Sequence, residues 1–146
     1  MMNKLRRAVF LDRDGTLNKM IYYPDHGIID SPFIPSQMSL IPGAARALKN
    51  LRRKKFLLIL VSNQPGVAKG HMGEKTFAAI DKTFDALLAK QGAALDSKYY
   101  CKHHPSATLV KYRKKCACSK PKPGMLLLAA KNLRIDVKRS YMVGDG

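Results

Sequence analysis

The 146-residue sequence lacks any apolar run long enough to cross a bilayer. Its most apolar stretch, residues 56–61, has the length of a strand, whereas a membrane-spanning helix needs about 20 apolar residues. The N-terminus carries Lys4, Arg6 and Arg7 but lacks the apolar core of a secretory signal peptide. We therefore expect a cytoplasmic protein with no membrane partner.

Acidic residues are scarce, since 10 Asp and Glu stand against 27 Lys and Arg, for a formal net charge of +17. Such a balance favours anionic partners, either phosphorylated small molecules or nucleic acid. The basic residues are scattered, with their densest runs at residues 49–55 and 111–122, and they form no single arginine-rich arm. Charge alone therefore leaves open both partner classes, and also a basic surface without a specific partner.

Cysteine is also rare. Its three copies, Cys101, Cys116 and Cys118, lie close together in the sequence, and an odd number cannot all pair in disulfides. In a reducing compartment such close spacing is more typical of metal ligands than of a disulfide framework.

Internal repeats and low-complexity segments are absent, and strand-like segments alternate with helix-like ones. We expect strands at residues 8–12, 56–62, 99–101 and 141–143, and helices at residues 44–55, 74–91 and 125–133. This order predicts a single α/β domain over residues 1–146, with a doubly wound parallel sheet. Residues 18–41 and 102–122 interrupt the pattern, and we expect both to be functional loops, the first a loop or cap near the active face.

Two carboxylates, Asp12 and Asp14, directly follow the first predicted strand and precede a glycine turn. In a parallel sheet, reacting groups gather beyond the carboxyl ends of the strands. There, one Asp can attack as a nucleophile while the other moves the proton of the leaving group. Because Ser62 and Asp145 also follow apolar runs, we expect them to face the same crevice as Asp12.

The cysteines form part of two i, i+2 pairs, Cys101 with His103 and Cys116 with Cys118. On extended backbone each pair directs both side chains to one side. Two such pairs predict a tetrahedral Cys₃His site for structural Zn²⁺. His104 is an alternative to His103, but it lacks the same-side spacing. The metal would order a segment that has too little apolar content to fold alone.

The order of these motifs, at residues 12–16, 62–64, 120 and 143–145, resembles that of the haloacid dehalogenase (HAD) superfamily of phosphohydrolases. The resemblance implies a HAD-like Rossmannoid fold with a zinc-binding loop and no large cap domain. It implies that Asp12 forms an aspartyl-phosphate and that Asp14 acts as general acid and then general base. It also implies that Asp12, the backbone carbonyl of Asp14, and Asp145 bind Mg²⁺, while Ser62 and Lys120 hold the transferring phosphoryl group.

The segments around the cysteines, residues 99–105 and 116–125, resemble the bacterial D,D-heptose 1,7-bisphosphate 7-phosphatases and the related histidinol-phosphate phosphatases. This resemblance implies a small phosphorylated sugar as substrate, heptose bisphosphate above all, and a monomer for the full-length fold. It implies substrate contacts by Arg13, Asp25, His26, Gly27, Ile28, Ser62, Asn63, Gln64, Pro65, Ser119 and Lys120.

The sequence departs from the family pattern at two places. Ser119 stands where the family usually has Arg, so a bidentate contact is missing. The chain ends at Gly146, within the fourth motif, where family members continue with an acidic residue, a strand and a helix. We therefore expect weaker Mg²⁺ binding, low activity and self-association through an exposed edge at residues 141–143.

Other functions remain open at this point. The zinc loop is compatible with a histidinol-phosphate phosphatase, and the charge with a phosphatase of nucleic-acid ends. A third possibility is a zinc-stabilised nucleic-acid-binding module without catalysis, in which Tyr99, Tyr100 and Tyr112 stack on bases.

Overall fold

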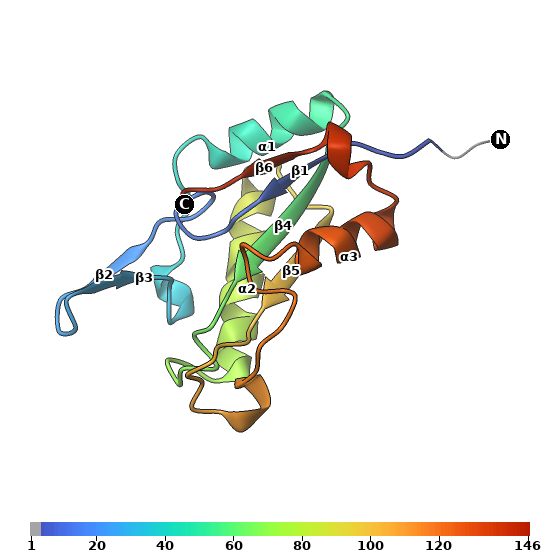
Figure 1. Ribbon diagram of the computed structural model, residues 1–146. Coiled ribbons are helices and arrows are strands. Elements are labelled where there is room, and N and C mark those ends of the chain that lie inside the picture. The colour runs from blue at the N-terminus through green and yellow to red at the C-terminus, as the bar shows by residue number, and fades with distance from the viewer. Residues whose placement is uncertain (1–3) are drawn as a thin grey trace.

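A parallel four-stranded sheet forms the centre of the computed structural model, which describes residues 4–146 (Figure 1). Its strand order is β5-β4-β1-β6, and every neighbouring pair is parallel. The strands are β1 (Ala8–Leu11), β4 (Leu57–Asn63), β5 (Ser97–Cys101) and β6 (Tyr141–Val143). The four predicted strands are therefore confirmed. β6 forms one edge of the described sheet, and its three side chains are exposed.

Helices cover both faces of the sheet, as a doubly wound fold requires. In β1, Val9 and Leu11 pack in one core with α1 (Ala44–Arg53) and α2 (Glu74–Lys90). The alternate β1 residues, Ala8 and Phe10, pack in a second core with α3 (Gly124–Leu133). Because successive strand residues point to opposite faces, α3 lies across the sheet from α2, as Figure 1 shows. All three predicted helices are present.

The strand register brings the predicted motifs to one edge of the sheet. Leu11, the last residue of β1, pairs with Leu60 of β4 and with Val143 of β6. The ladder continues one residue further, where the Asp12 amide donates to the Val143 carbonyl at 3.0 Å. The polar residues that follow β1, β4 and β6 therefore emerge together at the carboxyl end of the sheet.

Residues 18–41 contain more regular structure than the sequence predicted. β2 (Ile21–Tyr23) and β3 (Ile28–Asp30) form an antiparallel hairpin, which a 3₁₀ turn, η1 (Pro35–Gln37), follows. Figure 1 shows the hairpin projecting from the body of the sheet. Strands of three residues are too short to show an alternating pattern, which explains why the hairpin escaped prediction.

Residues 102–122 are largely irregular. They contain one 3₁₀ turn, η2 (Val110–Tyr112), and Ala107 is their one buried side chain. A further 3₁₀ turn, η3 (Val137–Arg139), leads into β6. No helix within residues 4–146 is long and apolar enough to cross a membrane.

Candidate active site and metal centre

Four carboxylates line a cavity of about 240 Å³ at the carboxyl end of the sheet: those of Asp12, Asp14 and Asp145, and that of Asp30 from the hairpin. The other lining residues are Met20, Ser31, Asn63, Pro65 and Lys120. A neighbouring cavity of about 560 Å³ also contacts Asp12, Asp145 and Lys120. The structure thus brings together the acidic residues and the lysine that the sequence placed in separate motifs.

Asp12 lies beside a cation. Its Oδ1 accepts a hydrogen bond from the Arg13 amide at 2.8 Å and lies 3.0 Å from the Lys120 Nζ. The two side chains are 21% and 23% exposed, so the pair is accessible to a ligand in the cleft. A carboxylate in this setting can attack an electrophile, while the ammonium group offsets the charge of an anionic substrate.

Asp14 is held on both carboxylate oxygens. Its Oδ1 accepts from the Arg13 Nε at 3.1 Å and from the Asn18 Nδ2 at 2.9 Å. Its Oδ2 accepts from the Gln64 Nε2 at 2.6 Å. These donors fix the orientation of a carboxylate that is still 14% exposed toward the cleft.

Gly15 makes room for Asp145. It has φ +82°, a conformation that favours glycine, and any side chain there would collide with the Asp145 carboxylate. The turn at Gly15 therefore lets Asp145 approach Asp12 and Asp14 in the cavity. Carboxylate and carbonyl oxygens are the ligands that Mg²⁺ prefers, so this donor set suits Mg²⁺.

Asn63 holds the backbone of Lys120 at two points. Its Nδ2 donates to the Lys120 carbonyl at 3.2 Å, and its Oδ1 accepts from the Lys120 amide at 2.9 Å. The sequence predicted that Asn63 contacts substrate, but its amide group is used to fix the loop that carries Lys120. No sequence signal distinguishes these two roles, because they depend on which chain segment lies opposite Asn63.

Three other predicted substrate contacts are buried beneath the cleft. Arg13 is 1% exposed, Ser62 1% and Gln64 2%, and none of them lines either cavity. Gln64 links the group, since its Nε2 also donates to the Ser62 Oγ at 3.0 Å. Pro65 does line the cleft, whereas Ser119 is half-buried beside Lys120 and lines neither cavity.

The predicted contacts at Asp25, His26, Gly27 and Ile28 lie at the exposed tip of the β2–β3 hairpin. They line neither of the two cavities near Asp12. Residues at the base of the hairpin, Met20, Asp30 and Ser31, line the cleft instead. These three residues carry no motif, and the hairpin that positions them has no pattern in the sequence.

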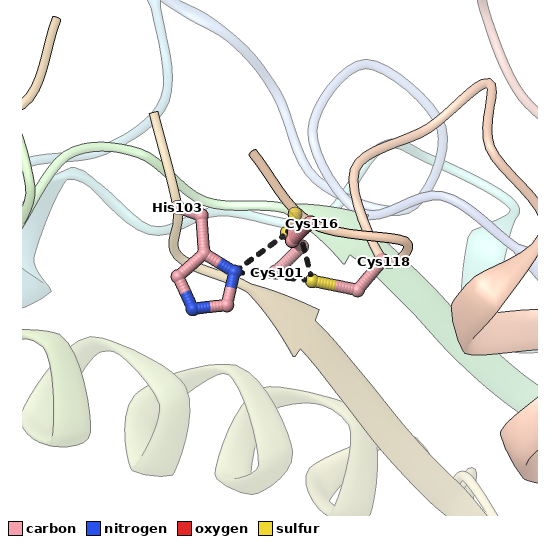
Figure 2. A group of neighbouring side chains, drawn as sticks. All are labelled: Cys101, His103, Cys116 and Cys118. Carbon is pink, nitrogen blue, oxygen red and sulfur yellow. Dashed lines mark hydrogen bonds between the residues drawn. The ribbon is translucent and has the colours of Figure 1, made fainter. Parts of the chain in front are cut away.

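The four predicted metal ligands converge, as Figure 2 shows. Their ligand atoms all lie within 4.8 Å of one another. The Cys116 Sγ lies 3.4 Å from the Cys101 Sγ and 3.3 Å from the Cys118 Sγ, and the His103 Nδ1 lies 3.3 Å from the Cys118 Sγ. Tetrahedral sulfur ligands at the usual distance from zinc lie about 3.8 Å apart, so the cluster has the size of a zinc site.

His104 does not belong to this cluster. Its Nδ1 accepts a hydrogen bond from the Ser106 amide at 3.0 Å. The structure thus places His103, and not His104, among the three cysteines, as the same-side spacing of Cys101 and His103 predicts.

The three thiols differ in acidity. Burial opposes ionisation of Cys116, but hydrogen bonds with Cys118, Cys101 and His103 outweigh it and lower the pKa of Cys116 to about 6. Burial, followed by hydrogen bonds with the two other thiols, raises the pKa of Cys118 to about 12. Burial also raises the pKa of Cys101. One thiolate therefore forms readily, while further ionisation needs a cation to offset the crowded charge.

Residues 32–146 match the family of haloacid dehalogenase-like hydrolases. This chain belongs to that family. A D-glycero-beta-D-manno-heptose-1,7-bisphosphate 7-phosphatase from Photorhabdus laumondii is 44% identical over 94% of this chain and 69% of its own length. The protein of the same name from Escherichia coli K12 is 41% identical over 99% of this chain and 71% of its own length.

A solved structure is similar as well. The D,D-heptose 1,7-bisphosphate phosphatase from B. bronchiseptica, complexed with magnesium and phosphate, superimposes with a TM-score of 0.77 at 29% identity. The match covers 96% of this chain and 70% of that one. The HAD-like parallel α/β fold predicted from the motifs is thereby confirmed, as is membership of a hydrolase family.

Proposed function

We propose that this chain is a Mg²⁺-dependent phosphatase whose substrate is a small sugar phosphate, D-glycero-D-manno-heptose 1,7-bisphosphate, with heptose 1-phosphate as product. The observation that carries the proposal is the juxtaposition of Asp12, Lys120, Asp14 and Asp145 in one cleft. Two relatives that are 44% and 41% identical to this chain over the aligned residues are named for that substrate.

The chemistry needs two carboxylates with different tasks. An Asp12 oxygen attacks phosphorus, and the bond from phosphorus to the sugar oxygen breaks as Asp14 gives its proton to that oxygen. Water then attacks the aspartyl-phosphate, its proton passes to Asp14, and the bond from phosphorus to Asp12 breaks to release phosphate. Lys120, 3.0 Å from Asp12, offsets the negative charge that nucleophile and phosphoryl group bring together.

Two metal ions fit the residues present. Asp12, Asp145 and the backbone carbonyl of Asp14 would hold Mg²⁺, which offsets charge on the phosphoryl oxygens when bound. Cys101, His103, Cys116 and Cys118 would hold Zn²⁺, and four protein ligands leave no open position, which assigns that ion a structural role. Three free thiols in this chain also favour a reducing, cytoplasmic location.

The direct test is phosphate release from heptose bisphosphate in the presence of Mg²⁺. Histidinol phosphate and a 3′-phosphorylated oligonucleotide, at the same concentration, show whether another phosphomonoester is preferred. Asp12→Asn is the matched control, because the amide keeps the shape of the side chain without its nucleophilic charge. The proposal is wrong if protein with the metal cluster intact releases no phosphate from any sugar phosphate.

A further inference from the structure

The largest fully buried side chain in the described part of the protein belongs to Arg13, the residue between the two catalytic aspartates. Asp12 and Asp14 both line the cleft, whereas Arg13, which lies between them, lines neither that cavity nor its neighbour. The Arg13 guanidinium group instead contacts the Asp14 carboxylate within the protein interior. A side chain that is 1% exposed in this position is poorly placed to contact a substrate.

Arg13, Gln64 and Asp14 form a closed triangle of hydrogen bonds. The Arg13 Nη2 donates to the Gln64 Oε1 at 2.9 Å and to the Asp14 Oδ2 at 3.4 Å, and the Arg13 Nε donates to the Asp14 Oδ1 at 3.1 Å. The Gln64 Nε2 completes the triangle by donating to the Asp14 Oδ2 at 2.6 Å. A carboxylate bound in this way from two directions has little freedom to rotate.

Two aromatic rings hold the guanidinium group in its place. The Arg13 Cζ lies 6.0 Å from the centre of the Phe77 ring and 5.8 Å from that of Tyr100. The Tyr100 hydroxyl donates in turn to Asp81 on α2, which anchors that ring. The position of Asp14 thus depends on α2 and β5 through the single side chain of Arg13.

We propose that Arg13 and Gln64 are positioning residues, which hold the Asp14 carboxylate in the orientation that delivers its proton to the leaving-group oxygen. The inference rests on the proposed function, since it assumes that Asp14 is the general acid. It replaces the expectation that Arg13 and Gln64 contact the substrate.

A purely structural role accounts poorly for Arg13. Burying a cation is costly, and an apolar side chain of similar volume often stabilises a fold as well or better. In addition, the Arg13 Nη1 is buried without a hydrogen-bond partner among residues 4–146, so the fold leaves part of this group unsatisfied. The side-chain hydrogen bonds that Arg13 donates go to Asp14 and to Gln64.

Two substrates with different leaving groups show whether Arg13 and Gln64 position the Asp14 proton or only stabilise the fold. A sugar oxygen needs a proton in order to leave, whereas an aryl oxygen such as that of p-nitrophenyl phosphate leaves without one. Loss of the general acid therefore slows hydrolysis of the sugar phosphate far more than hydrolysis of the aryl phosphate. The appropriate quantity is kcat/KM, which covers the steps up to departure of the leaving group.

The experiment compares Arg13→Lys and Gln64→Leu with the unmodified protein and with Asp14→Asn. Lys keeps the positive charge, but its single nitrogen cannot reproduce the bonds from the Arg13 Nε and Nη2 to Asp14 and Gln64. Leu at position 64 removes the hydrogen bond from the Gln64 Nε2 to the Asp14 Oδ2. Leu88→Ala, in the α2 core, serves as a control for lost stability away from the site. Folding of every variant is checked by thermal unfolding, and both substrates are assayed in the presence of Mg²⁺.

We expect Arg13→Lys and Gln64→Leu to lower kcat/KM for the sugar phosphate by about 10- to 100-fold, a part of the 10²–10⁴-fold that general acid–base catalysis supplies. For the aryl phosphate we expect a change of less than about threefold, and KM values close to those of the unmodified protein. Leu88→Ala should affect both substrates equally.

An equal loss on both substrates in the two variants would overturn the inference. So would a raised KM with unchanged kcat, because that pattern indicates direct substrate binding. If Asp14→Asn itself slows both substrates equally, the proposed role of Asp14 is wrong, and the inference fails with it. If Asp14→Asn discriminates between the substrates and the other two variants do not, only the inference is wrong.

Discussion

Removing the metal from the Cys₃His cluster should loosen residues 102–122 and, through them, displace Lys120 from Asp12. The perturbation is Cys116→Ser, or exposure of the unmodified protein to a chelator. Cys116 lies within 3.4 Å of two other ligand atoms, so its loss leaves an incomplete site. The sheet retains both of its cores, and we expect local rather than global unfolding.

The expected loss of order is large because few other interactions hold residues 102–122 in place. It buries a single side chain, Ala107, and it is tied to the rest of the protein by a small number of hydrogen bonds. These include Thr108 to the Ala68 carbonyl and the two bonds between Asn63 and Lys120. Each contributes about 1 kcal/mol to stability, whereas zinc binding by structural sites supplies about 10–16 kcal/mol. A bound metal would therefore dominate the local order.

Hydrogen exchange provides the assay. Amides of residues 102–122 should lose protection in Cys116→Ser and after chelation, while those of β1 and β4 keep theirs. Activity should fall with a raised KM, since Lys120 no longer holds the phosphoryl group. His104→Ala is the matched control: that histidine neighbours the cluster without belonging to it, and its variant should keep one zinc per chain.

The result that would refute this reasoning is simple to obtain. Protein purified without chelator should contain one equivalent of zinc by elemental analysis. Metal-free protein in which residues 102–122 remain protected would show that hydrogen bonds and the Ala107 contact suffice. The same conclusion would follow if Cys116→Ser kept the exchange pattern and the KM of the unmodified protein.

Three further substitutions have expected outcomes that can be checked directly. Asp12→Asn should abolish phosphate release while the thermal unfolding curve stays close to that of the unmodified protein, because the amide keeps the shape of the side chain but is not a nucleophile. Asn63→Ala should raise KM by about tenfold with a smaller effect on kcat, measured by steady-state kinetics, since it removes both bonds to the Lys120 backbone, each worth about 1 kcal/mol. Gly15→Ala should lower the free energy of unfolding by about 1–2 kcal/mol, because φ is +82°, and should raise the Mg²⁺ concentration needed for half-maximal activity, because the new methyl group displaces Asp145.

The sequence predicted the central sheet because its signals are local. The apolar runs that become β1 and β4 are buried on both faces, and the apolar positions of α2 recur at helical spacing. The β2–β3 hairpin has no such signal, since it buries no complete strand face and spans three residues on each side. Its strands form from pairing with each other rather than from burial, which sequence periodicity does not reveal.

For the candidate site, the sequence predicted that the residues after the strand ends gather, but it also placed residues 25–28 there, which lie away from the cleft. Asp12, Lys120 and Asp145 meet because the carboxyl ends of parallel strands lie at the same end of the sheet. Applying this rule requires only the order of the elements. Whether Asn63 and Arg13 face the substrate depends on the direction of each side chain and on what packs against it. Those contacts arise from segments far apart in the chain, so no local pattern specifies them.

The Cys₃His cluster and Lys120 belong to one segment of the chain. Residues 102–122 carry seven Lys and Arg and no Asp or Glu, a composition that attracts anionic substrates. Their mutual repulsion, however, opposes a compact arrangement, and the segment's buried apolar surface is limited to Ala107 and to Cys116 and Cys118, which are partly buried against the α3 core. The cluster at Cys116 and Cys118 can order such a segment without an apolar core. Because Lys120 follows Cys118 by two residues, we expect a metal bound at the cluster to help hold Lys120 beside Asp12.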